Sequence, residues 1–169
     1  MSKRIIVLCL GLVFLVSSYA FAEEKIGYVN TIKVIQEYNK AKKYNDLLEK
    51  KEEEINKEVE TKRQEAAEKI EKMRSKFSLL DEEKKKEEQE KMIQEERKYQ
   101  GFLYEKRADL MKQQDEYRRE VSEDIMNEIE DYAKKNKYSF ILERAALLYA
   151  IDENNVTDKI INELNKKKR

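Results

Sequence analysis

A stretch of 107 residues, 31–137, contains no proline and a single glycine, Gly101. It is rich in Glu, Lys, Gln, Arg and Leu, which are strong helix formers. One unbroken helix of this length would extend about 160 Å at about 1.5 Å per residue. A break near the middle is therefore expected, and most of the chain must fold as long helices.

The expected break lies at 78–82. Asp81 is a good N-cap residue, and the two glutamates that follow it place negative charge in the first turn of the next helix. Two arms result, 31–79 and 82–137, each about 75 Å long. Because arms of similar length bring the chain back to its starting point, the sequence predicts a helical hairpin with its tip near 78–82.

Apolar residues follow a heptad-like spacing along both arms, from Ile55 to Leu80 and again from Tyr99 to Tyr132. This seam is dense near the base of the hairpin and sparse toward its tip. Few buried apolar contacts imply low local stability. The arms are therefore expected to be anchored at the base and mobile further out.

Apolar side chains in the outer part of the hairpin are candidates for binding apolar segments of other proteins, because flexible apolar side chains suit varied partners. Packing between the arms is the competing explanation for each, since apolar residues at helical spacing usually form a seam. Phe102 and Tyr104 flank Leu103 on other faces and are the strongest candidates. The full set is Met73, Phe77, Leu79, Leu80, Met92, Ile93, Tyr99, Phe102, Leu103 and Tyr104.

The segments on either side of the hairpin arm, 32–137, have strand-like patterns. Residues 25–30 alternate between apolar and polar types. Two further apolar runs, 138–142 and 145–151, have strand length and aromatic or branched residues. Residues 23–31 and 138–169 are therefore expected to form one small β-containing body, and the fold class is mainly α with a small β body.

This body comprises about 40 residues, close to the size at which a lone domain needs disulfides, metal or association. Two or three short strands would also leave open edges, which closure into an oligomeric β-barrel removes. A monomer whose hairpin covers the body is the alternative. The candidate oligomer core comprises Ile26, Tyr28, Val29, Phe140, Leu142, Leu147, Tyr149 and Ile151.

Missing residue types exclude most catalytic and metal chemistry. The chain has no His, and its one cysteine is Cys9. The usual zinc, copper and haem ligands and a Ser-His-Asp or Cys-His arrangement are therefore absent. No glycine-rich phosphate-binding motif occurs. We expect no enzyme activity, no cofactor and no metal.

The first 22 residues have the pattern of a secretory signal peptide. Lys3 and Arg4 precede the apolar run 5–16, and Ala20 and Ala22 supply the small residues of a cleavage site. We expect cleavage after Ala22, with an uncleaved anchor as the alternative. Loss of the two basic residues leaves 34 Lys and Arg against 36 Asp and Glu, a formal charge of −2. Nucleic acid is an improbable partner for such an exported chain.

The ends of the exported chain resemble those of the Skp/OmpH family. The resemblance rests on Lys25-Ile26-Gly27-Tyr28-Val29-Asn30, on Tyr138-Ser139-Phe140-Ile141-Leu142-Glu143, on Leu148-Tyr149-Ala150 and on Asn155-Val156-Thr157-Asp158. It implies a homotrimer in which three chains build a small β-barrel and three hairpins surround a cavity. It also implies a periplasmic location and unfolded outer-membrane proteins as clients.

The expected function is therefore that of an ATP-independent holdase chaperone. The best-known family members are strongly basic, whereas this exported chain is near neutral, so the resemblance carries no expectation about binding of lipopolysaccharide or a membrane surface. A structural coiled-coil scaffold of the envelope, or an adaptor of an export system, is the alternative. It explains the arms but not the strand-forming ends. A holdase suppresses aggregation of unrelated unfolded proteins, whereas a scaffold binds one folded partner.

Overall fold

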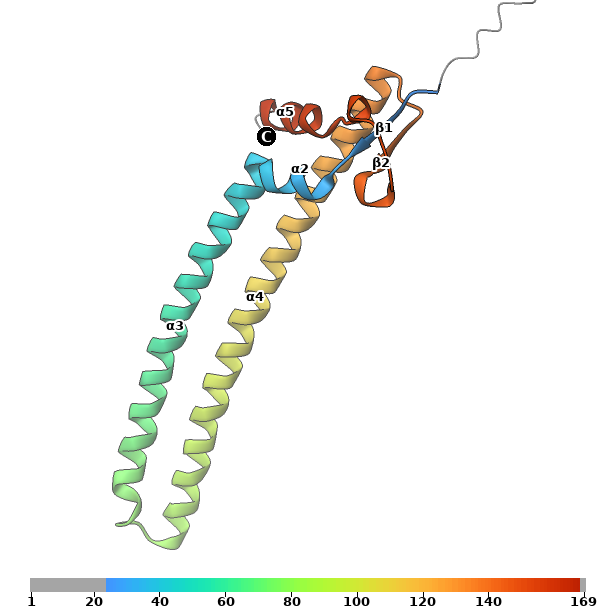
Figure 1. Cartoon of the computed structure of the whole chain (residues 1–169). Helices are drawn as coiled ribbons and strands as arrows, with labels where there is room; N and C mark the ends of the chain where they lie inside the picture. Colours follow the sequence, from blue (N-terminus) through green and yellow to red (C-terminus); the bar gives the residue numbers. More distant parts are fainter. Residues whose placement is uncertain (1–23, 168–169) are drawn as a thin grey trace, which may run out of the picture.

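The chain folds as a long helical hairpin on a small body (Figure 1). The computed structural model describes residues 24–167, so the predicted signal peptide, 1–22, lies outside the described residues. In chain order, the elements are β1 (Ile26–Val29), α2 (Thr31–Glu37), α3 (Asn39–Phe77), α4 (Glu82–Asn136), β2 (Phe140–Glu143), the short 3₁₀ turns η1 (Arg144–Ala146) and η2 (Asp152–Asn154), and α5 (Thr157–Lys166). This is the mainly helical fold with a small sheet that the sequence predicts.

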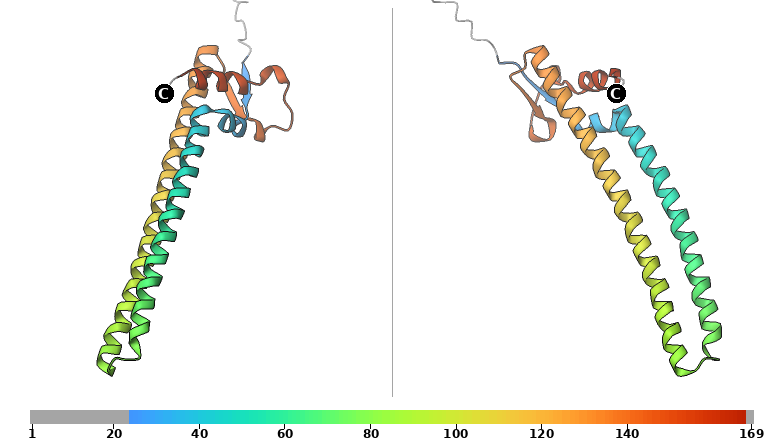
Figure 2. Two further views of the ribbon diagram at one scale, coloured as in Figure 1. Left: turned by 90° about the vertical axis from the view of Figure 1, so that its left-hand side faces the viewer. Right: turned by 180° about the vertical axis from the view of Figure 1, so that it is seen from behind.

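Helices α3 and α4 run side by side along the whole arm (Figure 2). Asp81 caps α4 as expected, because its side chain accepts a hydrogen bond of 2.9 Å from the backbone N–H of Lys84. No side chain between Asn56 and Glu120 is buried. The packing of the arm is therefore thin outside its root, as the sparse seam predicts.

The first arm is not continuous from residue 31, and this part of the prediction is wrong. Tyr38 has an extended backbone (φ −72°, ψ 120°) and separates α2 from α3. Its ring is buried, and its hydroxyl donates a hydrogen bond of 2.9 Å to Asp124 on α4. The break is therefore held by tertiary contacts. We call the junction of α2 and α3 at Tyr38 the elbow.

The sheet consists of β1 and β2 in parallel pairing, with Ile26 opposite Phe140 and Tyr28 opposite Leu142. A single bridge joins the other edge of β1 to Asn155. The predicted strand at 145–151 is wrong for the single chain. This segment begins in η1, bends at Leu148 and pairs with no strand among the described residues.

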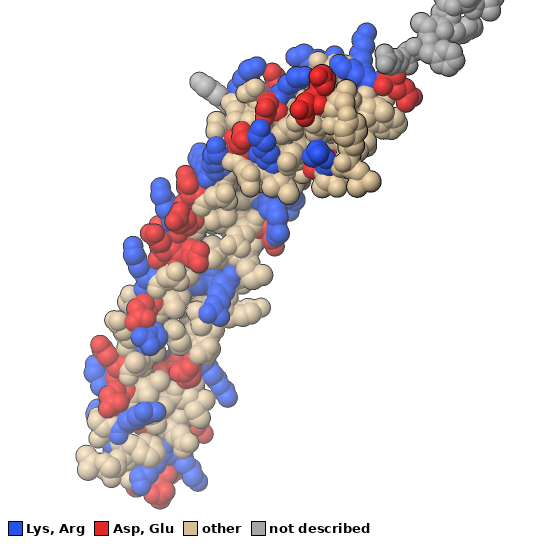
Figure 3. Space-filling view, viewed as in Figure 1, with Lys and Arg blue, Asp and Glu red and all other residues tan. Residues whose placement is uncertain are grey.

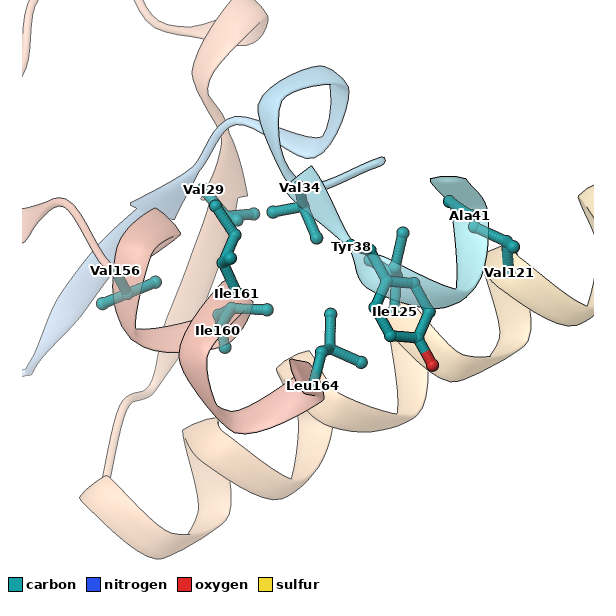
Figure 4. Close-up of a cluster of buried hydrophobic side chains, with 10 residues drawn as sticks. All are labelled: Val29, Val34, Tyr38, Ala41, Val121, Ile125, Val156, Ile160, Ile161 and Leu164. Atoms are coloured by element: carbon teal, nitrogen blue, oxygen red, sulfur yellow. The ribbon is translucent and has the colours of Figure 1, made fainter. Parts of the chain in front are cut away.

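The core lies where the body meets the root of the arm. Its buried side chains converge from β1, α2, α3, α4 and α5 (Figure 4). Val34, Val156 and Ile160 are fully enclosed. Burial of one such aliphatic side chain contributes about 1.5–3 kcal/mol. The core therefore fixes the position from which the arm extends.

Candidate functional site

A shallow groove lies between α3 and α4 in the outer part of the arm. Ile70 on α3 and Met92 and Ile93 on α4 supply its apolar surface, and its volume is about 390 Å³. The polar residues of its lining are Arg74, Gln89, Glu96 and Arg97. We call this set the arm groove.

The sequence spacing explains why arginine side chains accompany apolar side chains in the lining of the arm groove. Residues four apart lie on one face of a helix. Arg74 follows Ile70 by four residues, and Arg97 follows Ile93 by four. Each apolar side chain of this pair is therefore followed by a guanidinium group one turn further along.

An ion pair between the arms lies beside the arm groove. Lys69 Nζ is 3.2 Å from Glu95 Oε2. Hydrogen bonds from Lys98 and then from Lys69 lower the pKa of the Glu95 carboxyl below its usual range. This carboxylate links α3 to α4 next to the groove.

A second polar link joins the arms nearer the root. Lys106 Nζ on α4 is 2.5 Å from Glu58 Oε2 on α3, and it also lies 5.3 Å from the centre of the Phe102 ring. The hydrogen bond from Lys106 lowers the pKa of Glu58. Polar links thus supplement the thin apolar seam.

The structure brings together only part of the candidate set. Met92 and Ile93 line the arm groove. Leu79 is 86% exposed at the tip and Tyr104 is 78% exposed on α4. The remaining candidates are half-buried along the arms: Met73, Phe77, Leu80, Tyr99, Phe102 and Leu103.

The sequence interpretation missed Ile70 as a groove residue, because it was assigned to the seam between the arms. The four polar residues of the lining were also missed. The spacing of four residues between apolar and charged positions was the available signal. It could not be distinguished from the many solvated charged residues of the same helices.

A second apolar surface lies on the outer face of the sheet. Residues two apart in a strand share a face, so Ile26 and Tyr28 lie with their partners Phe140 and Leu142. Arg144 covers the Tyr28 ring at 5.6 Å, but the other three side chains are exposed. We call Ile26, Phe140 and Leu142 the outer sheet face.

The candidate oligomer core divides between this surface and the interior. Tyr28 and Val29 are buried within the single chain, and Val29 belongs to its core. Leu147 is half-buried, and Tyr149 and Ile151 are exposed on the loop after β2. Opposite the outer sheet face, Val29 and Ile141 pack against the helices.

Basic and acidic side chains intermingle along the visible face of the arm (Figure 3). No large patch of one sign is visible on that face. Within residues 24–167 no cluster of acidic, histidine or cysteine side chains has the makings of a metal site. None of the helices in this range is long and apolar enough to span a membrane.

Together, fold and surfaces define a class of protein in which a small α/β body carries one long helical hairpin with exposed apolar side chains. The chain belongs to the OmpH-like outer membrane protein family, whose model matches residues 25–164.

The same fold occurs in a crystal structure from Caulobacter crescentus CB15 that is described as an OmpH-like outer membrane chaperone. The two structures superpose with a TM-score of 0.75 over 89% of each chain, at 12% sequence identity. At this identity the likeness concerns the fold. No curated protein matches the sequence.

Proposed function

We propose that the protein is an ATP-independent holdase chaperone of the periplasm. As a homotrimer, it holds unfolded outer-membrane proteins between the helical hairpins of its three chains. This prevents their aggregation before membrane insertion. The observation that carries the proposal is the arm groove, an apolar surface open to solvent on an arm that buries no side chain between Asn56 and Glu120. Membership of the OmpH-like family supports it.

The holding step uses many weak apolar contacts. An unfolded membrane protein exposes apolar surface that aggregates with other chains. Each Å² of apolar area that it buries against Ile70, Met92 or Ile93 contributes about 25 cal/mol. Contacts of this size are individually weak, so bound segments exchange while the chain as a whole stays held. No step requires nucleotide.

Association through the outer sheet face supports the trimer. A two-stranded sheet is marginally stable by itself, and the helices cover only the face that carries Val29 and Ile141. Ile26, Phe140 and Leu142 leave the opposite face apolar and uncovered. Copies that meet at this face close the open strand edges in a shared barrel. The copy number of three follows from the family resemblance.

The mass of residues 23–169, measured by light scattering with and without a urea-denatured outer-membrane porin, tests both the trimer and the holding of unfolded clients. We expect a trimer that keeps the porin soluble in a defined complex. Phe140→Glu places a charge on the outer sheet face and is expected to lower the mass. Lys159→Glu, a charge change at an exposed position of α5 outside that face, is the control. A wild-type chain that leaves the porin to precipitate contradicts the holdase and favours a structural scaffold.

A further inference from the structure

We propose that α5 is a cross-tie that joins the roots of the two arm helices and sets the direction of the arm relative to the body. The elbow is the point of attachment. Asn165 on α5 accepts a hydrogen bond of 2.8 Å from the backbone N–H of Asn39, and its Nδ2 donates one of 3.1 Å to the Glu37 carbonyl. One side chain therefore hydrogen-bonds to a backbone carbonyl at the end of α2 and to a backbone N–H at the start of α3.

The start of α3 depends on this contact. The first amides of a helix lack partners within it and are normally capped by a side chain. Tyr38 precedes α3 and makes no side-chain cap. Asn165 supplies the missing acceptor from a different helix, so the first turn of α3 is positioned by α5.

The same end of α5 also binds α4. Lys167 Nζ lies 2.5 Å from Glu128 Oε2 and 3.4 Å from Asp131 Oδ2. Glu128 is only 4% exposed. Removal of the cation from a buried ion pair leaves an unpaired buried carboxylate, which strongly destabilises the folded state. The last turn of α5 and the residue after it therefore hold both arm roots.

The beginning of α5 binds the body. The backbone N–H of Asn30 donates to Thr157 Oγ1 at 3.0 Å, and Lys33 Nζ pairs with Asp158 at 2.6 Å. The N–H of Val156, just before α5, donates to the Tyr28 carbonyl of β1 at 2.9 Å. α5 thus connects the sheet to both ends of α2, beside which it lies in Figure 1.

A long arm amplifies small changes at the elbow. The 39 residues of α3 extend about 58 Å. A rotation of about 10° at its root therefore moves its far end by about 10 Å. Within the proposed function, the cross-tie fixes the width of the space between the hairpins of the three chains. The tie itself is a property of the single chain and does not depend on client binding.

Electron–electron distance measurements on residues 23–169 test the cross-tie. Spin labels at Glu52→Cys on α3 and Ser139→Cys on the body are specific, because this range contains no other cysteine. Labelled chains are diluted into unlabelled protein. We expect Asn165→Ala to widen the distance distribution about twofold. Asn162→Ala, an exposed asparagine on the same helix, is the matched control and leaves it unchanged.

Asn165→Asp separates the two bonds, because a carboxylate still accepts from Asn39 but cannot donate to Glu37. An intermediate width is expected. A folded Asn165→Ala chain with the wild-type distribution overturns the proposal, as does lower thermal stability without any widening. If Asn165→Ala does not fold, an unchanged distribution in Asn165→Asp overturns it. No porin is present, so this result is separate from the test of the holdase.

Discussion

The ring of Tyr44 on α3 lies flat against the ring of Tyr117 on α4, with centroids 3.9 Å apart and planes inclined by 11°. The Tyr44 hydroxyl also donates a hydrogen bond of 2.5 Å to Glu120 Oε2. This pair lies between the enclosed core of the root and the thinly packed outer arm. It therefore joins α3 to α4 by a ring stack and a hydrogen bond together.

Replacement of Tyr117 by alanine removes the stack and part of the seam. We expect the free energy of unfolding to fall by about 2 kcal/mol, since aromatic pairs contribute about 0.5–1.5 kcal/mol beyond the area that they bury. Urea unfolding at one fixed protein concentration measures it. Tyr104→Ala, at an exposed position of the same helix, is expected to change stability by less than about 0.5 kcal/mol. Equal losses in the two variants would contradict a special role for the stack.

The polar side of this junction makes stability depend on acid. Hydrogen bonds from Tyr44 and then from Lys40 lower the pKa of Glu120 below its ordinary value of 4.5. A lowered pKa in the folded state stabilises the fold above pH 4.5, and this contribution is lost as the pH falls through the lowered value. We therefore expect the Tm difference between wild type and Glu120→Gln to be present at pH 7 and to shrink below pH 4.5.

Glu123→Gln, at an exposed position one turn away on α4, provides the control for the acid titration. Differential scanning calorimetry of the three chains at pH 7, 5 and 3 gives the comparison. A Tm difference for Glu120→Gln that stays constant over this range would show that Glu120 is not coupled to the fold through its charge.

Local signals predict the hairpin but not the elbow. Asp81 caps α4 because an aspartate before two glutamates is a helix start in almost any context. Tyr38 carries no such signal, since tyrosine is tolerated inside helices. The helix break at Tyr38 depends on contacts with Asp124 and Asn165, which lie 86 and 127 residues further along the chain. The sequence around Tyr38 therefore could not predict it.

The segment 145–151 illustrates the opposite error. Its residues favour strands, and Leu147 and Ile151 do have extended backbones. A strand also needs a partner, and the single chain offers none to this segment among the residues that the structure describes. The arm groove was only partly predictable for a related reason. Met92 and Ile93 are apolar residues on a charged helix, but the contribution of Ile70 depends on the register between α3 and α4.

Ile93→Ser tests the arm groove. Ile93 is 45% exposed, so its replacement removes apolar area that a bound segment can contact. Loss of about 1 kcal/mol of apolar contact corresponds to a roughly fivefold weaker complex. Fluorescence titration with a urea-denatured porin measures the affinity. Met111→Ser, an exposed apolar position of α4 outside the groove, is the control, and an equal effect of both variants would contradict a specific groove.

The two glycines of the described chain give opposite predictions for one substitution. A Cβ atom on Gly27 would lie 2.9 Å from Cε1 of Tyr138, whereas nothing lies within 4 Å of one on Gly101. Tyr138 packs against the core and stacks at a tilt on Tyr132, so it has little room to retreat. Gly27→Ala is therefore expected to cost about 1–3 kcal/mol through overpacking.

Gly101→Ala is expected to stabilise α4 by about 0.5–1 kcal/mol, because alanine restricts the unfolded chain and favours the helix. Thermal unfolding of both variants beside wild type, at equal concentration, measures the expected decrease in Tm for Gly27→Ala and the expected increase for Gly101→Ala. A lower Tm for Gly101→Ala would mean that its side of α4 is covered in the assembled protein. That surface would then belong to an interface between copies, although it is exposed in the single chain.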